Sequence, residues 1–186
     1  MTDEFTQFDH GLDKLRDEAA TVQRNLGAAK RAIEADPNLS DQGRREQIAT
    51  LRDSAQTRLD QLKAAEVKAI KDKTTSLERS VFGYTSTTDP SEIISRRDAD
   101  DRADRLQDSK EAEALLERAE RAGDKHLAQA IIRVAAVRGY QGVVRAYESE
   151  HPATGSKLAL LAQIQQGTTT ANYLLRRTAA YSARLL

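Results

Sequence analysis

Apolar side chains recur through the first 33 residues at alternating spacings of three and four positions, and no position in the series is missed. They are Phe5, Phe8, Leu12, Leu15, Ala19, Val22, Leu26, Ala29 and Ile33. Such a repeat is typical of a coiled-coil seam, in which a narrow apolar stripe of one helix packs against another helix. The pattern predicts a long first helix, from about Thr2 to Ala35.

A second long helix follows after a short turn. Proline at position 37 disfavours helical geometry in Asp36 and so ends the first helix, and Ser40 or Asp41 can cap the next one. Apolar positions then continue from Ile48 to Val81. Because a short loop makes two long helices antiparallel neighbours, residues 1–82 are predicted to form a helical hairpin.

The rest of the chain is predicted to form shorter helices. Residues 83–90 contain turn-forming residues and no helical period, so they are interpreted as a linker. Asp89 is expected to cap the next helix with Pro90 at its first position, and Ser109 is expected to cap another. Glycines and prolines divide the remainder, with a break expected at Gly167. The predicted fold is therefore all-α: a hairpin at 1–82, a linker at 83–90, and a charged helix plus a small helical bundle at 91–186.

The charge and composition of the chain argue against nucleic acid and membrane as partners and against secretion. Lysine and arginine balance aspartate and glutamate to a net charge of +0, and cysteine is absent. A neutral chain has no general attraction for nucleic acid or anionic membrane. The polar, acidic N-terminus is unlike a secretory signal, and the most apolar stretch, Ala128 to Val137, is interrupted by Arg133 and is too short to span a bilayer. We expect a soluble intracellular protein with no membrane partner.

No residue pattern indicates catalysis, a metal or a cofactor. The three histidines, His10, His126 and His151, lie in separate segments without a second ligand at metal-binding spacing. The aspartates between positions 98 and 104 alternate with arginines at ion-pair spacing, which is typical of a solvated helix face. No phosphate-binding loop, dinucleotide fingerprint or nucleophile elbow is present. The sequence therefore predicts a protein that is not an enzyme and holds no cofactor.

The C-terminal segment is the exception to the balanced charge. From residue 151 to the end there are four basic residues and no acidic one. The arginines can be a helix-end cluster favoured by the helix dipole, or they can be a docking surface for an acidic protein. The predicted docking residues are Arg176, Arg177 and Arg184. Binding of nucleic acid is the weaker interpretation, because a nucleic-acid surface usually has more basic residues on one face, with aromatic residues beside them. Tyr173 and Tyr181 share a helix face, which is interpreted as packing.

The apolar seam also predicts self-association, because its width can exceed what one partner helix covers. The seam residues assigned to a homo-oligomer contact are Phe5, Phe8, Leu12, Leu15, Val22, Leu26 and Ile33. The alternative is that the second helix of the same chain satisfies the seam completely.

The segment from Asp36 to Leu77, with its Leu-Ser-x-x-Gly-Arg turn before an Ala/Arg/Leu-rich helix, resembles small helical head-morphogenesis or scaffold-type proteins of tailed actinobacteriophages. The resemblance implies an elongated, helical, often oligomeric protein whose basic C-terminal segment touches the capsid protein. The function expected is that of a phage scaffold or minor virion structural protein. The alternatives are a protein-binding adaptor acting through the C-terminal bundle and, less favoured, an oligomeric DNA-packaging or DNA-binding factor.

Overall fold

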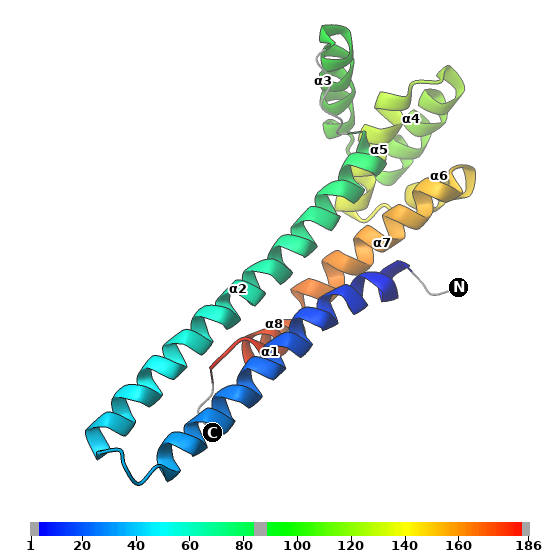
Figure 1. Cartoon of the computed structure of the whole chain (residues 1–186). Helices are drawn as coiled ribbons and strands as arrows, with labels where there is room; N and C mark the ends of the chain where they lie inside the picture. Colours follow the sequence, from blue (N-terminus) through cyan, green and yellow to red (C-terminus); the bar gives the residue numbers. More distant parts are fainter. Residues whose placement is uncertain (1–3, 84–88, 184–186) are drawn as a thin grey trace. The chain divides into compact units, whose positions relative to one another are not determined.

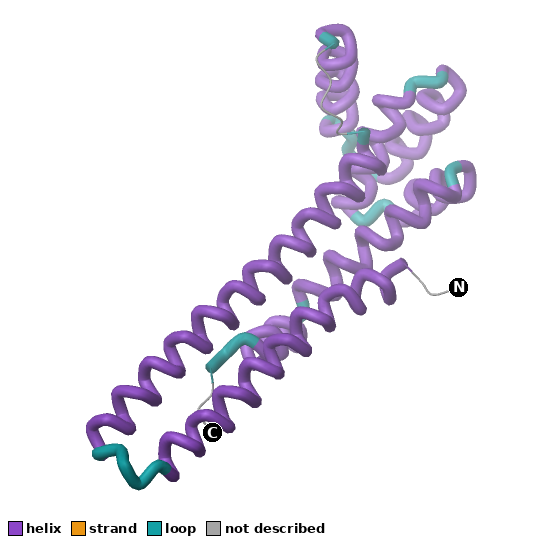
Figure 2. The backbone as a smooth tube through the Cα atoms, in the orientation of Figure 1, coloured by secondary structure: helices purple, strands orange, loops and turns teal. Residues whose placement is uncertain are grey.

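The described residues of the computed structural model, 4–83 and 89–183, form eight α-helices joined by short connections (Figure 2). The all-α prediction is confirmed. The helices are α1 (Glu4–Ala35), α2 (Asp41–Phe82), α3 (Pro90–Asp104), α4 (Ser109–Ala122), α5 (Lys125–Arg138), α6 (Gln141–Glu150), α7 (Pro152–Thr169) and α8 (Ala171–Ala180).

The chain divides into two compact units, and the division differs from the one expected at residues 83–90. Unit 1 comprises Met1–Lys73 and Gln163–Leu186, and unit 2 comprises Thr74–Ala162. The end of the chain therefore belongs with the two long helices, although the sequence grouped it with the shorter helices. The last turns of α2, expected to be part of the hairpin, belong with unit 2.

In unit 1, α1 and most of α2 run in opposite directions and are joined by the turn at residues 36–40 (Figure 1). Of the two expected caps, Ser40 is the residue that caps α2, since its hydroxyl accepts a hydrogen bond from the Gly43 amide at 3.1 Å. Ala19 of α1, Leu59 and Leu62 of α2 and Tyr181, which follows α8, form the core of this unit. The two long helices thus share their core with the C-terminal segment.

Two glutamine side chains fix that segment to the long helices. The Gln23 amide donates to the carbonyl oxygens of Ala180 and Ser182, both at 3.0 Å. The Gln56 amide donates to the Tyr181 carbonyl at 3.3 Å and accepts from the Ala183 amide at 2.9 Å. Carbonyl groups at the C-terminal end of a helix lack hydrogen-bond donors within the helix. The two glutamine side chains supply donors to carbonyl oxygens at and just after the end of α8. This is the physical reason why the C-terminal segment joins unit 1.

Unit 2 packs α3, α4 and α6 around α5. Ile131 and Ile132 of α5 are completely buried in its core. Its helix boundaries follow the chemistry read from the sequence: Asp89 caps α3 by accepting from the Ser91 amide at 2.9 Å, and Gly123 ends α4 in the left-handed conformation, with φ of 67°. Glycine adopts this conformation without the steric cost that a side chain incurs.

Two boundaries differ from those expected. The residue that caps α4 is Asp108, whose carboxylate accepts from the Glu111 amide at 2.8 Å, and Ser109 is the first residue of the helix. Helix α7 continues through Gly167 to Thr169, so the expected break falls three residues later, at Thr170. A single glycine lowers helix stability by only about 1 kcal/mol and does not by itself end a helix.

The charged face of α3 pairs with another helix as well as with itself. Arg102 lies 3.6 Å from Asp98 within α3, as the alternating charges predict. Arg133 of α5 also approaches Asp100 at 3.1 Å and Asp104 at 2.8 Å. This arginine, which interrupts the most apolar stretch of the sequence, therefore joins α5 to α3.

We predict that Leu26→Asp opens unit 1 and leaves unit 2 folded. Leu26 is 2% exposed, and a buried carboxylate without a partner costs several kcal/mol. Limited proteolysis with mass spectrometry should show rapid cleavage within residues 4–73 and 163–183 and slow cleavage within 89–162. The control is Leu175→Asp, the same change at a side chain that is 70% exposed. Equally rapid cleavage of both units in Leu26→Asp would contradict the division.

Candidate functional site

A buried carboxylate lies at the centre of unit 1. Glu66 of α2 is 0% exposed, and among the described residues it is the only buried side chain that is charged. Its oxygens accept hydrogen bonds from the Tyr173 hydroxyl at 2.5 Å, from the Arg16 guanidinium at 3.0 Å and from the Tyr181 hydroxyl. Three segments that are far apart in the sequence therefore meet at one side chain.

The donors are placed by helix geometry. Tyr173 lies on α8, and Tyr181 is the residue that follows the helix, eight positions later, so the expected shared helix face is not formed by both residues although both reach Glu66. Arg16 lies on α1, where Asp13 and Asp9 precede it by about one and two turns. Its guanidinium pairs with Asp13 at 3.0 Å and with Asp9 at 3.6 Å as well as with Glu66. A single arginine thus pairs with three carboxylates.

The environment keeps Glu66 ionised. Burial by itself raises the pKa of this carboxyl group, but hydrogen bonds from Tyr173, Tyr181 and Arg16, together with the charge of Arg16, outweigh burial, so the pKa lies below its ordinary value of 4.5. Burial and the hydrogen bond to Glu66 raise the pKa of Tyr173 to about 12. A general base works best with a pKa near the working pH. The low pKa of Glu66 therefore suits a structural role, in which the ionised carboxylate holds its donors together, better than a role in proton transfer.

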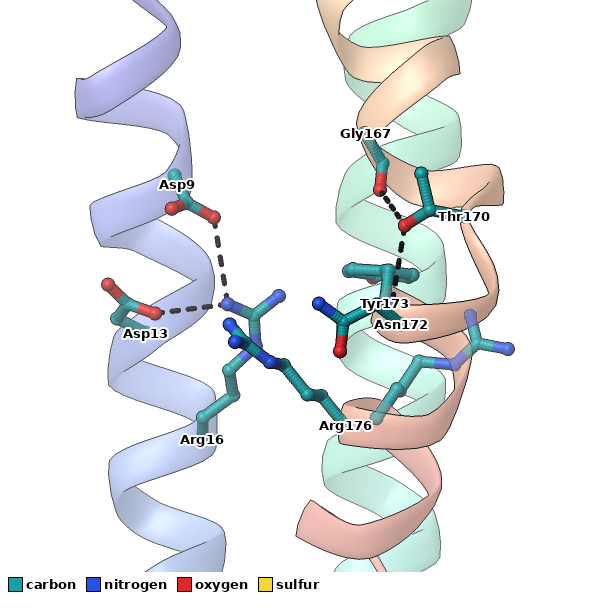
Figure 3. Close-up of a pocket in the computed structure, with 9 residues that line it drawn as sticks. Asp9, Asp13, Arg16, Gly167, Thr170, Asn172, Tyr173 and Arg176 are labelled. Atoms are coloured by element: carbon teal, nitrogen blue, oxygen red, sulfur yellow. Dashed lines mark hydrogen bonds and ion pairs between the residues drawn. The ribbon is translucent and has the colours of Figure 1, made fainter.

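A cavity of about 440 Å³ opens beside this cluster, within unit 1 (Figure 3). The wall on α1 consists of Asp9, Asp13 and Arg16, and the opposite wall comes from the end of α7 and from α8. On that wall the Thr170 hydroxyl accepts from the Tyr173 amide at 3.2 Å and so caps α8. Asn172, Arg176 and Arg177 complete the lining.

The predicted docking arginines occupy different environments. Arg176 is exposed, whereas Arg177 is half-buried, with its guanidinium carbon 5.7 Å from the centre of the Tyr173 ring. Arg184 lies outside the described residues. Two large apolar side chains precede them on the surface of α8: Leu174 is 42% exposed and Leu175 is 70% exposed. The exposed side chains of α8, called its outer face below, therefore combine an apolar pair with a cation that also lines the cavity.

The predicted seam residues whose side chains the structure describes are buried or half-buried. Leu12 and Leu26 are buried, and Leu15 and Val22 pack against the cluster that contains Leu59, Leu62 and Tyr181. Phe8 and Ile33 are half-buried, and the side chain of Phe5 lies outside the described part of the structure. These contacts favour the alternative in which one chain satisfies the seam, with the C-terminal segment contributing as well as α2. Self-association stays a prediction.

Sequence reasoning missed Glu66 and Arg16. A signal for Glu66 exists, because the spacing of Leu59, Leu62, Glu66 and Ala69 places this carboxylate in an apolar position of the 3–4 repeat. A charged residue in such a position indicates a buried partner. No comparable signal identifies the partner, since Arg16, Tyr173 and Tyr181 meet it only through tertiary packing.

Metal-binding groups and membrane-spanning helices are not found in the described part of the chain. No group of three or more histidine, cysteine, aspartate or glutamate side chains could hold a metal ion, and no described helix is long and apolar enough to cross a membrane. Comparison with protein-family models, with curated proteins and with solved structures gives no match. The resemblance of Asp36 to Leu77 to phage head-morphogenesis proteins thus stays a prediction.

We predict that Glu66 makes unit 1 sensitive to acid. Because its pKa is lower in the folded chain than the ordinary value of 4.5, the unfolded chain binds the proton first as pH falls. The stability that Glu66 contributes is therefore present above about pH 4.5 and is lost as pH falls toward the folded pKa. Glu66→Gln should lower the free energy of unfolding at pH 7 by roughly 1–3 kcal/mol and flatten its dependence on pH below 4.5.

Urea unfolding followed by circular dichroism at a series of pH values measures this. Glu113→Gln, the same change at an exposed side chain of α4, is the matched control and should preserve the stability and pH profile of the original sequence. An unchanged acid limb in Glu66→Gln would show that Glu66 is not the group responsible.

Proposed function

We propose that this chain is a non-enzymatic interaction protein that binds an acidic protein surface through the outer face of α8. The observation that carries the proposal is the exposure of Leu174 and Leu175 beside Arg176, in a segment that has no acidic residue from 151 to 186. Protein interfaces are enriched in arginine, and their buried centres are more apolar than the rest of the surface. The partner surface therefore combines an apolar patch with carboxylates.

The rest of unit 1 supports this role by holding α8 in place. The inner face of α8 is fixed by the Tyr173 hydrogen bond to Glu66, and the residues that follow it are fixed by Gln23 and Gln56. A rigid helix loses little conformational freedom on binding, which favours affinity. We propose a scaffold or minor structural protein of a phage particle, with a capsid or other virion protein as the acidic partner. This context rests on the resemblance of residues 36–77.

A groove in unit 2 favours a second candidate, a protein-binding adaptor. A cavity of about 470 Å³ lies between α4 and α6, with Leu116, Ala146 and Tyr147 among its lining residues. Three carboxylates also line it, those of Glu117, Glu120 and Glu150. An apolar groove with acidic walls suits a basic amphipathic helix, which is a partner of the opposite charge.

We predict that a photo-crosslinking amino acid at position 175 captures an acidic protein in lysate of the native host or phage-infected cells. The same amino acid at position 137 is the control, since Val137 is 82% exposed but lies on α5 in unit 2. Adding Arg176→Glu to the position-175 variant should reduce the yield several-fold, because it replaces attraction with repulsion. Mass spectrometry identifies the captured protein.

Capture of the same protein from both positions would contradict a specific site on α8. So would a captured protein without an acidic surface. A basic partner captured from a probe at Ala146, which lines the groove, would instead favour the adaptor.

Self-association through the seam of α1 is a separate proposal for the second partner, another copy of the chain. We expect sedimentation equilibrium at micromolar concentration to show a mass above that of the monomer. Leu12 and Leu26 are already buried within one chain, so such a contact has to rearrange the packing of unit 1. A strictly monomeric mass would contradict the proposal and leave the seam as an internal contact.

A further inference from the structure

The cavity of unit 1 holds three arginines, and only one of them is paired with carboxylates. Arg16 pairs with Glu66 and Asp13, each at 3.0 Å, and with Asp9 at 3.6 Å. Among the described residues, Arg176 and Arg177 have no carboxylate within ion-pair distance, which is 4.0 Å. The wall of the cavity on α8 therefore carries two positive charges without a protein counter-charge.

Arg177 is half-buried and lines the cavity. Its Nε atom is covered by protein and has no hydrogen-bond partner, so only the exposed atoms of this side chain can meet a ligand. A ligand that brings an acceptor suits the charge of Arg177, which has no carboxylate beside it among the described residues.

Tyr173 brings a second cation toward the same place. The guanidinium carbons of Arg16 and Arg177 are each 5.7 Å from the centre of its ring. These cation–π contacts are favourable and help to hold both guanidinium groups beside the ring. Arg16 is already paired with carboxylates, so Arg177 is the cation at this ring that an added anion would pair with.

The first turn of α8 completes the arrangement. Thr170, which caps the helix, and Asn172 both line the cavity. The N-terminus of a helix carries a partial positive charge and favours anions. The helix terminus and the two arginines thus favour the same sign of ligand charge through independent observations.

We propose that this cavity binds a tetrahedral oxyanion of the phosphate class, held by Arg177, Arg176 and the first turn of α8. Arginine presents a planar fork of donors that fits phosphate, and donors from separate residues suit several oxygens better than the two of a carboxylate. The volume of about 440 Å³ is within the range of pockets for small organic ligands. The oxyanion is therefore either free phosphate or the phosphoryl group of a larger molecule. This site goes beyond the proposed protein interface, with which it shares only Arg176.

Calorimetric titration of the full chain with inorganic phosphate, at constant ionic strength in a buffer without phosphate, tests the proposal. We expect saturable binding that Arg177→Gln weakens about tenfold or more, because it removes a charge-assisted contact. The matched control is Arg145→Gln, an exposed arginine of α6 in unit 2, which should leave the affinity within about twofold, since an exposed charge in another unit adds little. Circular dichroism checks that each variant is folded, and Arg176→Gln, at an exposed position, replaces Arg177→Gln if the latter does not fold.

A variant of opposite sign sharpens the test. Asp9→Asn removes a negative charge from the cavity wall and should tighten phosphate binding. Absence of saturable binding at millimolar phosphate, equal weakening by Arg145→Gln, or weaker binding by Asp9→Asn would each overturn the proposal.

Adenosine monophosphate and adenosine distinguish the sources of the oxyanion. Tighter binding of the monophosphate than of inorganic phosphate supports a larger phosphorylated ligand, and the reverse order supports free phosphate. Adenosine that binds as tightly as its monophosphate would overturn recognition of the phosphoryl group. None of these measurements requires the protein partner of α8, so the failure of this site and the failure of the proposed interface are distinguishable.

Discussion

The packing of unit 1 depends on keeping one buried charge satisfied. An ionised carboxylate without water is among the most costly groups that a protein can bury, and it is tolerated only when donors surround it. Glu66 receives hydrogen bonds from two tyrosine hydroxyls and one guanidinium. Because those donors come from α1 and from the C-terminal segment, the carboxylate of α2 requires all three to be present together. Removing any one of them leaves a buried oxygen with fewer partners.

This requirement gives the C-terminal segment a defined position. An amphipathic helix of ten residues is marginal by itself in water, and α8 has no buried residue of its own. Tyr173 within it and Tyr181 just after it attach it to Glu66, and Gln23 and Gln56 bind the backbone at its end. The polar contacts on the inner side therefore determine which side chains of α8 remain outside. Tyr173 turns toward Glu66, and Arg177 lies beside the Tyr173 ring. Leu174, Leu175 and Arg176 consequently remain exposed.

Charge is distributed unevenly in the same unit. Three carboxylates surround Arg16, whereas Arg176 and Arg177 have none among the described residues. In a chain with a net charge of +0, helix packing thus places the acidic residues of α1 beside one arginine and leaves the two arginines of α8 without a carboxylate partner in the described part of the chain. Local arrangement, rather than net charge, determines which anions such a protein can attract.

The sequence by itself determined the helices and most of their ends. The 3–4 spacing of apolar residues, the prolines at 37 and 90, and the caps at Ser40, Asp89 and Asp124 act over a few residues, so their effects can be read locally. The grouping of the helices and the candidate site could not be read in this way. Arg16, Glu66 and Tyr181 are separated by 50 and 115 residues, and nothing in the local pattern states which donor reaches which acceptor. Only the tertiary structure decided that the C-terminal segment belongs with the long helices, because the free energy of satisfying a buried charge depends on all of its partners at once.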